Sequence, residues 1–524
     1  MNLKSLSTAF PLASLLLAGG CAAAPSATPP APSPTTEIRG AETITAEDMY
    51  ARVAFLASDL LRGRDTPSRG LDIAASYLVS EYRLLGLEPA GENGTYYQHY
   101  PFPLLALDTA TLHFGTIAGS DNENRMLAYG TDFFVSGVLD PVRDEGASMG
   151  HARLVFIGNL GEEGLPAGAY EGAAPIVTLP GAYSRDWRAT ASRARRAATE
   201  AGARALVLVV EPEFPRDDFQ ALAESFAEPG RTIPTPGEIP VFYLTHAAAE
   251  GVVARAGTSL AELASASAPT PLERVESHFA GTLLRVDDAQ APNVAAVLRG
   301  SDPDLRDEYV ILSAHMDHVG VGDPVNGDSI FNGADDDASG TSGLLEVAQA
   351  FASLEERPRR SIIFLHVSGE EKGLLGSRWY SEHPTVPLEQ IVANINVDMI
   401  GRNAPDSVVV IGKDYSSLGD VVNAVGASHP ELDLVAADDI WPEERFFFRS
   451  DHFNFARKEI PAIFFFTGVH EDYHRPSDEV DALDVDKAAR VAKLIFYTVR
   501  SIANDPQAPT WDPAGLAEVR ALTR

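Results

Sequence analysis

The second half of the chain contains four short apolar runs, and a charged residue or a histidine follows each of them. Their length and unbroken hydrophobicity predict buried β-strands. Between the first two runs, apolar residues recur at helical spacing and predict a helix. This alternation is typical of the α/β class, so we expect a mixed, mostly parallel sheet covered by helices on both faces. The runs are residues 309–315, 361–368, 391–397 and 461–467, and the helical positions are Leu344, Leu345, Ala348 and Phe351.

Helices are also predicted before and after these runs. Residues 45–61 and 71–85 have apolar positions at helical spacing; Thr45 can act as an N-cap, and the second helix stops at Gly86. No strand follows at once for these helices to pack on, which indicates that another unit is inserted. Residues 485–502 predict a closing helix.

An inserted domain is expected at residues 126–280. This stretch contains four strand candidates and a basic helix at 188–201, but no cluster of histidine, cysteine and acidic residues. We therefore divide the main domain into residues 41–125 and 281–505, and we assign 506–524 to a C-terminal tail. The strand candidates are residues 152–157, 175–179, 205–210 and 240–244.

Composition agrees with two folded units and excludes one class of partner. The chain has 524 residues, of which 45% are hydrophobic, and this is enough to build two cores. With 41 basic and 74 acidic residues, its formal net charge is −33. A surface this acidic repels phosphate groups, so we expect no nucleic-acid partner.

The first forty residues predict export. Residues 1–21 contain one lysine near the start, an apolar run too short to span a bilayer, and Cys21, the only cysteine. This segment resembles a bacterial lipoprotein signal, which implies that Cys21 is lipidated and becomes the mature N-terminus; the alternative is an ordinary secretory signal. Residues 22–40 form a polar, proline-rich tether. We expect a periplasmic or cell-surface protein that meets a membrane only through its lipidated N-terminus.

Metal-binding residue types follow the predicted strands. Because the carboxyl ends of parallel strands meet at one edge of a sheet, these side chains are expected to converge. Histidine and carboxylate ligands without thiolates suit a divalent ion such as zinc. Taken singly, each has an ordinary explanation, such as a hydrogen-bonded histidine, a helix N-cap or a solvated turn. The candidates are His315, one of Asp335–Asp337, one of Glu370 and Glu371, Asp398 and His474.

Five candidate ligands exceed the three protein ligands of a single catalytic zinc, which favours two ions that share a carboxylate. Two ions can hold a hydroxide between them and polarise a carbonyl, and a further carboxylate can carry the proton of the water to the leaving amine. The adjacent Glu370 and Glu371 can supply one ligand and one base.

Taken together, these motifs resemble the co-catalytic di-zinc aminopeptidase family, which includes bacterial leucyl aminopeptidases, aminopeptidase Y and glutamate carboxypeptidase II. The resemblance implies the zinc exopeptidase fold, and the insertion is similar to a protease-associated domain. The motifs that carry it are residues 309–340, 369–377, 396–402, 450–452 and 473–478.

The resemblance also implies a role for each site residue. One Zn²⁺ is expected on His315 and Asp398 and a second on Glu371 and His474, with Asp336 as the bridge. The bond from Asp336 to Asp337 is then expected to be cis. Glu370 would be the general base and Tyr473, unless it is only a packing aromatic, the donor to the oxyanion.

Two further acids are assigned supporting roles. Asp317 is placed to accept the second N–H of the His315 imidazole and to fix its tautomer, as carboxylates beside metal ligands commonly do. Asp451 is expected to act similarly near His474, or to be purely structural.

We expect a metallo-exopeptidase that removes N-terminal residues from peptide substrates, because an acidic surround attracts an α-ammonium group. The alternatives are a carboxypeptidase on acidic peptides, a glutaminyl-cyclase-like acyl transfer with one zinc, and a binding protein without activity. The last is disfavoured because no ligand is missing. The acids are Glu370, Asp398, Asp439, Glu443 and Glu444; Arg402, Arg445 and Arg449 keep the carboxypeptidase alternative open; and Phe446–Phe448 either line a specificity pocket or are buried.

Overall fold

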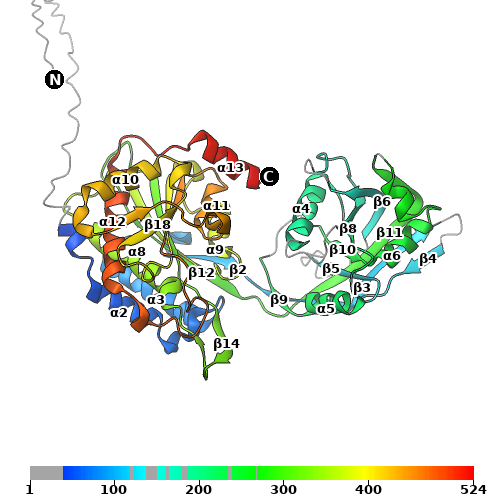
Figure 1. Ribbon diagram of the computed structural model, residues 1–524, viewed down its shortest axis with the longest axis horizontal. Helices are drawn as coiled ribbons and strands as arrows, with labels where there is room; N and C mark the ends of the chain where they lie inside the picture. The colour runs from blue at the N-terminus through cyan, green and yellow to red at the C-terminus, as the bar shows by residue number, and fades with distance from the viewer. Residues whose placement is uncertain are drawn as a thin grey trace, which may run out of the picture.

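The computed structural model describes residues 39–118, 123–136, 150–160, 164–179, 187–233, 239–266 and 268–523. The predicted signal segment, residues 1–21, lies outside the described residues, as does the tether up to residue 38. Arg39 and Gly40 are described and open a short helix, although the sequence places them in the tether. Among the described helices, none combines the length and hydrophobicity needed to cross a bilayer. The described chain forms two lobes, each built on its own sheet (Figure 1).

The first sheet has nine strands and is mixed. Its centre is parallel: β13 lies between β16 and β17, and β20 follows β17. Antiparallel strands flank this centre, with β12 beside β16 and β18 beside β20. The predicted α/β class with a mostly parallel core is confirmed. Its strands are β1 Glu88–Pro89, β2 Tyr97–Pro101, β12 Gln290–Leu298, β13 Tyr309–His315, β16 Ser361–Val367, β17 Ile391–Val397, β18 Ser407–Ile411, β19 Val435–Ala437 and β20 Ala462–Phe466.

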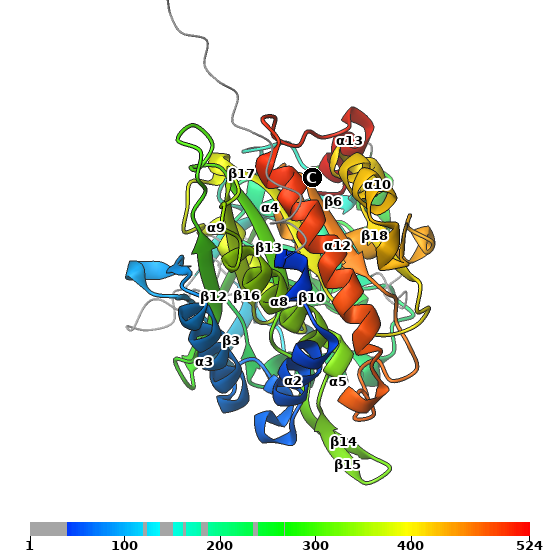
Figure 2. The ribbon, with the colours of Figure 1, turned by 90° about the vertical axis from the view of Figure 1, so that its left-hand side faces the viewer.

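Helices cover both faces of this sheet. Figure 2 shows α12, α8, α2 and α3 in front of the strands, and the largest apolar core lies between these helices and the sheet. The opposite face packs against α9 and α11, where Tyr380 meets Phe455 in a second core. The helices are α2 Ala46–Leu56, α3 Arg69–Leu84, α8 Gly340–Ala352, α9 Leu375–Glu382, α10 Leu418–Ser428, α11 His452–Ala456 and α12 Val485–Asn504.

The first predicted helix is shorter than expected. Thr45 caps α2 by accepting a hydrogen bond from the backbone N–H of Asp48 at 3.0 Å, but the helix ends at Leu56 and not at residue 61. A 3₁₀ turn, Asp59–Arg64, replaces its last part, and Gly63 has a φ of 68°. A Cβ at Gly63 would lie 2.4 Å from the carbonyl oxygens of Gly320 and Phe331, so only glycine allows this turn to pack on the hairpin of β14 Gly320–Val325 and β15 Asp328–Phe331.

The second lobe holds another nine-stranded sheet. It extends beyond the insertion expected at 126–280, because the long antiparallel pair β3 and β11 belongs to it and runs from Leu104 to Arg285. Its parallel strands β6, β7, β8 and β10 correspond to the four predicted strands. The elements are β3 Leu104–Ala118, β4 Glu123–Met126, β5 Phe133–Ser136, β6 Gly150–Asn159, β7 Ala173–Thr178, α4 Trp187–Glu200, β8 Leu206–Val209, α5 Arg216–Ala227, β9 Gly230–Arg231, β10 Val241–Leu244, α6 His246–Ala254, α7 Leu260–Ala264 and β11 Thr270–Arg285.

The two lobes join at the edge of the first sheet where the parallel strands end. Pro101, the last residue of β2, pairs with Gln290, the first of β12. Because β12 is antiparallel to β16, this pair lies beyond the carboxyl end of β16. Asp287 holds the crossing by accepting hydrogen bonds from the backbone of Leu104 and from both terminal nitrogens of Arg231. The second lobe is therefore attached beside the end of the sheet to which the candidate ligands belong.

The C-terminal segment 506–524 is not a loose tail. Residues Pro513–Thr523 form α13, and Val519 is buried against the first lobe. Arg520 makes two hydrogen bonds to Glu459, and the indole N–H of Trp511 donates to the Glu459 carbonyl.

Candidate metal centre

Five elements of the first lobe deliver the predicted ligands to one place. His315 ends β13, and Asp398 directly follows β17. Asp336 lies in the turn before α8, Glu371 in the turn after β16, and His474 in the loop after β20. The structure thus brings together all five residues that the sequence proposed as ligands.

Asp336 lies between two groups of ligand atoms. Its Oδ1 is 3.2 Å from Nε2 of His315, which is itself 3.5 Å from Oδ1 of Asp398. Its Oδ2 is 3.2 Å from Nε2 of His474, which is 3.0 Å from Oε2 of Glu371. Each oxygen of the Asp336 carboxylate therefore faces a different histidine and acid pair, as a bridging ligand requires.

The spacing of these atoms fits metal ions. A tetrahedral zinc with ligands ~2.0–2.2 Å away holds neighbouring ligand atoms roughly 3.3–3.6 Å apart. Several of the buried atoms have no hydrogen-bond partner of acceptable geometry among the described residues, although they lie this close together. Buried polar atoms are normally satisfied, so the donor set suits two divalent cations. Among the proposed ligands, the atoms without partners are Asp336 Oδ2, Glu371 Oε1, Asp398 Oδ1 and His474 Nε2.

Charge in the site agrees with this assignment. Burial alone would raise the pKa of Asp336, but His318, His315 and His474 outweigh burial and hold that pKa well below its usual value. Burial lowers the pKa of His474, yet Asp336 and Glu371 raise it to about 10. The acids thus draw protons onto the histidines, and divalent cations bound by the same atoms would displace those protons.

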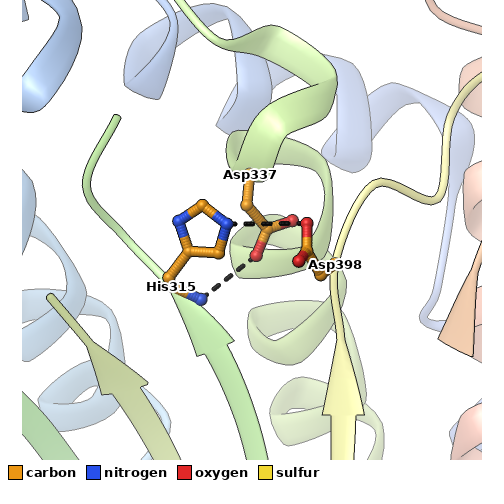
Figure 3. A group of neighbouring side chains, drawn as sticks. All are labelled: His315, Asp337 and Asp398. Carbon is orange, nitrogen blue, oxygen red and sulfur yellow. Dashed lines mark hydrogen bonds and ion pairs between the residues drawn. The ribbon is translucent and has the colours of Figure 1, made fainter. Parts of the chain in front are cut away.

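Asp337 supports the site through hydrogen bonds and is not the bridging ligand. Its Oδ1 accepts the backbone N–H groups of Gly340 and Met399, and its Oδ2 accepts the backbone N–H of His315 at 3.1 Å. Figure 3 shows it beside His315 and Asp398. Its oxygens are engaged with the ends of β13 and β17 and the start of α8, so Asp336 is the better ligand. The predicted cis bond between Asp336 and Asp337 is present.

His318 is a site residue that the sequence interpretation did not assign. Its buried Nδ1 lies 2.8 Å from Oε1 of Glu371 and 3.7 Å from Oδ2 of Asp336, and its ring meets that of His474 edge to face. These three residues, His318, Asp336 and Glu371, form a possible ligand group by themselves. The available signal was the His315–His318 spacing, which puts two histidines at the end of one strand.

The predicted role of Asp317 is wrong in one respect. The Nδ1 atom of His315 lies 3.1 Å from the backbone carbonyl oxygen of Asp317, whereas the Asp317 carboxylate is 3.7 Å away. That carboxylate instead accepts the N–H groups of Gly369 and Glu370 and the hydroxyl of Thr66. The Asp317 carboxylate thus binds backbone N–H groups of the turn at Glu370 and not the His315 ring. Asp317 therefore positions the two glutamates.

Other buried groups hold the ligands in place. Ser450 donates to Oδ2 of Asp398 at 3.0 Å. Asp478 accepts the backbone N–H groups of Asp335 and Asp336. The guanidinium of Arg64 donates to the carbonyl oxygens of Met316, Asn332 and Gly333, all next to the site.

Asp451 was expected to act near His474 or to be purely structural. It is fully buried, and the charged groups that most affect its pKa are His315, Asp317 and Asp398. Burial raises the pKa of Asp451 to about 7. Its role near His474 is therefore not supported.

Glu370 and Tyr473 line a small pocket over the ligands. Burial raises the pKa of Glu370 well above its usual value, and Asp451, Glu371 and Asp398 add to the rise. Burial also raises the pKa of Tyr473, so its hydroxyl keeps its proton. The pocket holds about 40 Å³, and its remaining walls are mainly apolar: Met399, Phe446, Phe464, Phe466 and Val469, with Arg449 and Ser450.

The alternatives for Phe446–Phe448 are thus resolved in part. Phe446 lines the pocket, whereas Phe447 is buried against Tyr415 and His452. Of the acids expected around the centre, Glu370 and Asp398 line the pocket but Asp439, Glu443 and Glu444 do not. Glu444 instead pairs with Arg449 at 3.2 Å.

Residues 293–499 match the family model described as Peptidase family M28. This segment is therefore similar to that family, whose model covers less than half of the chain. The M28 segment includes all five ligand candidates, Glu370 and Tyr473, and it excludes the second sheet up to β11.

Relatives with similar sequences match only part of the chain. A "Probable zinc metalloprotease" of Pyrenophora tritici-repentis is 26% identical over 294 residues, which cover 48% of this chain and 60% of the relative. A "Probable leucine aminopeptidase" of Arthroderma benhamiae is 26% identical over 216 residues, which cover 40% of this chain and 57% of the relative. The chain thus spans less than two thirds of the length of these curated relatives.

Solved structures also resemble the chain. An aminopeptidase from Aneurinibacillus sp. strain AM-1 has 18% identity and a TM-score of 0.47, with 91% of this chain and 98% of that chain covered. A zinc aminopeptidase from Bacillus subtilis has 17% identity and a TM-score of 0.46, with 89% and 97% covered.

Proposed function

We propose that the protein is a zinc-dependent aminopeptidase with two metal ions per chain. The observation that carries this proposal is the position of Asp336, whose two carboxylate oxygens face His315 with Asp398 and His474 with Glu371. The match of residues 293–499 to the model of peptidase family M28 supports it, as do the names of the relatives. Both groups of ligands are complete, which disfavours the one-zinc cyclase reaction and the inactive binding protein.

The site residues have different roles in peptide hydrolysis. Two zinc ions held by the five ligands would polarise the scissile carbonyl and lower the pKa of water. Glu370, which is not one of the ligands and lines the same pocket, takes the proton from that water and returns it to the leaving amine. The raised pKa of Glu370 favours the return of the proton to the leaving amine. The hydroxyl of Tyr473 donates to the oxygen on which negative charge develops.

The direction of cleavage is decided by the charge around the pocket. Glu370 and Asp398 favour an α-ammonium group, which supports N-terminal cleavage. Arg449 also lines the pocket, and because a guanidinium binds a terminal carboxylate, this residue supports the alternative of a carboxypeptidase. Its pairing with Glu444 and its stacking 4.7 Å from the Phe446 ring centre offset this charge. The balance therefore favours the aminopeptidase.

The test compares leucine anilide with its N-acetylated form. An aminopeptidase cleaves the free compound and leaves the acetylated one intact, because acetylation removes the ammonium charge. Equal cleavage of both, or consumption only of peptides with a free acidic C-terminus, would refute N-terminal cleavage. The di-zinc hydrolase would survive that result.

We further propose that the second lobe is a protease-associated-like domain and that the enzyme is exported and anchored through a lipidated Cys21. The signal resemblance of residues 1–21 supports the anchor. One acyl chain binds membranes only marginally, so stable anchoring requires several. The variant Cys21→Ser should move the protein from the membrane to the soluble fraction, and mass spectrometry that finds unmodified Cys21 would refute the anchor.

A further inference from the structure

A cleft of about 590 Å³ lies in the second lobe on the side that faces the first. Figure 1 shows α4, one of its walls, on the side of the second lobe nearest to α9 and α11. Residues of β3, β5, β10, β11 and α5 and the segment around β9 form the other walls, and the first lobe contributes Arg378 of α9. This volume falls within the ~300–1,000 Å³ typical of ligand sites.

The residue that the first lobe contributes to the cleft lies close to the metal ligands along the chain. Helix α9 begins at Leu375, four residues after Glu371. Asn293 at the junction of the lobes accepts the N–H of Ser368 at 3.2 Å and donates to the carbonyl of Gly376 at 2.9 Å. The turn that carries Glu370 and Glu371 is therefore bonded to the point where the second lobe is attached. Arg378 lies in the first turn of α9, directly after this bonded segment.

The lining is cationic in a protein of net charge −33. Four arginines and one glutamate line the cleft. One of the arginines, Arg231, is neutralised by Asp287 at 2.6 Å. Among the described residues, the guanidinium of Arg378 has no hydrogen bond or ion pair, and that of Arg188 has no contact beyond its stacking on Trp187, 5.5 Å from the ring centre. Two cationic groups are thus available to a ligand.

Nearby arginines add to the positive charge around the cleft. Burial lowers the pKa of Arg457, and although Glu382 opposes that effect, Arg378 of α9 and Arg196 of α4 lower the pKa further. Arginines of both lobes are therefore close enough to repel one another. Like charges brought together in this way are relieved by an anion, and guanidinium groups bind carboxylates with paired hydrogen bonds.

The remaining walls are apolar and aromatic. Tyr243 packs edge to face with Trp187 at 5.8 Å and is stacked with Phe226 at 6.2 Å. Leu105, Val135 and Val241 continue this surface. Such a floor suits the chain and side-chain carbons of a peptide, with its carboxylates directed to the arginines.

We propose that this cleft binds the downstream part of a peptide substrate through carboxylates, so that the enzyme prefers peptides that are acidic after the cleaved residue. This inference rests on the proposed peptidase function. The carboxylates can come from Asp and Glu side chains or from the C-terminus, and both sources present the same group to Arg378 and Arg188.

The experiment uses Leu-Ala-Gly-Asp-Glu and Leu-Ala-Gly-Asn-Gln, each as a free acid and as a C-terminal amide. Initial rates of leucine release give kcat and KM for the four peptides. We expect a lower KM for the acidic pair, and about a tenfold loss of that preference in Arg378→Gln or Arg188→Gln, the size of one charge-assisted hydrogen bond. The preference should fade as salt is raised. A preference for the free acids over the amides would assign the C-terminus as the source, and a preference for Asp-Glu would assign the side chains.

The matched control is Arg153→Gln, an exposed arginine of β6 that does not line the cleft. It should leave the acidic preference unchanged, and Arg378→Lys should retain part of it. Equal KM values for all four peptides in the unmodified enzyme would overturn the inference, as would an equal loss in Arg153→Gln.

A binding measurement separates this inference from the proposed function. Fluorescence anisotropy of a labelled, N-acetylated Ala-Gly-Asp-Glu peptide reports the cleft without any cleavage. Weaker binding by Arg378→Gln supports the cleft even if leucine anilide is not hydrolysed, in which case the proposed function alone fails. Hydrolysis of leucine anilide together with equal binding by both proteins refutes the cleft alone.

Discussion

The hydroxyl of Thr66 donates a hydrogen bond of 2.8 Å to Oδ2 of Asp317, although the two residues lie 251 positions apart. The N–H of Gly369 donates to both, at 3.0 Å to Thr66 and at 2.7 Å to Asp317. Gly369 has a φ of 69°, and a Cβ there would lie 2.6 Å from the hydroxyl of Tyr100. Segments before and after the second lobe thus together hold the turn that presents Glu370 and Glu371.

The first prediction concerns this support. Thr66→Val keeps the shape of the side chain but removes the hydroxyl, so the turn loses a buried partner. We expect kcat to fall about tenfold, because small displacements of catalytic groups are costly, while zinc content stays at that of the unmodified enzyme. Thr66→Ser should retain most of the activity. Steady-state kinetics with metal analysis would contradict this role if the valine variant were fully active or had lost zinc.

The elements that form the first sheet were largely predictable from sequence because each parallel strand is buried on both faces. Residues 309–315 and 361–367 contain no polar alternation and match β13 and β16. In contrast, β3 and β11 are long, partly exposed strands in which apolar and polar residues mix. They form no apolar run, so the second sheet was predicted too short at both ends.

The ligands were predictable for the same reason, since His315 and Asp398 stand at or just after the ends of buried strands. The contacts that hold the ligands in place were not predictable, because they join residues that are far apart in sequence. Arg64 and Thr66 come from a segment more than 200 positions before the ligands they support. Asp317 was recognised as important but was given the wrong partner, since the sequence does not show how tightly the Gly369 turn closes.

The second prediction separates the adjacent glutamates. Glu370→Gln should retain two zinc ions and lower kcat by roughly a hundredfold or more, the scale expected for loss of a general base. Glu371→Gln should instead lose zinc, because its Oε2 lies 3.0 Å from Nε2 of His474. Metal analysis after dialysis against a weak chelator measures both. Equal zinc loss in the two variants would show that their roles are wrongly assigned.

The third prediction concerns metal stoichiometry. Asp398→Ala and His474→Ala should each reduce bound zinc from two ions to one, because each removes a ligand of one group only. Asp336→Ala should lose both ions, since its two oxygens serve both groups. Asp323→Asn, an exposed acid of the β14 hairpin, is the control. A ratio of one ion per chain in the fully active unmodified enzyme would contradict the two-ion centre.

The fourth prediction concerns the pocket over the metal centre. A volume of about 40 Å³ limits the substrate side chain, and Phe446 forms part of the limit. Phe446→Ala should raise kcat/KM for phenylalanine anilide relative to alanine anilide by roughly tenfold or more, since each methylene accommodated in an apolar pocket changes this ratio by ~10-fold or more. Phe448→Ala, which does not line the pocket, should leave the ratio unchanged. The same shift in both variants would mean that Phe446 does not limit the pocket.

The last prediction concerns pH and lies away from the metal centre. Glu346 of α8 is fully buried, and its Oε1 is 2.7 Å from Nε of Arg52, which also contacts Glu81 and Gln349. Burial outweighs the attraction of Arg52 and raises the pKa of Glu346 from 4.5 to about 7. Between these two pH values the folded protein holds a proton on Glu346 that the unfolded chain has released. The free energy of unfolding must therefore fall as the pH rises through this range, by on the order of 3 kcal/mol for this group.

Glu346→Gln does not titrate, so its stability relative to the unmodified protein should increase from pH 5 to pH 8. Urea unfolding of both proteins at matched zinc concentrations measures the difference, in which the contribution of the metal cancels. Glu355→Gln, an exposed residue beyond the same helix, should show no such trend. A stability difference that is constant with pH would show that Glu346 is ionised in the folded protein throughout this range.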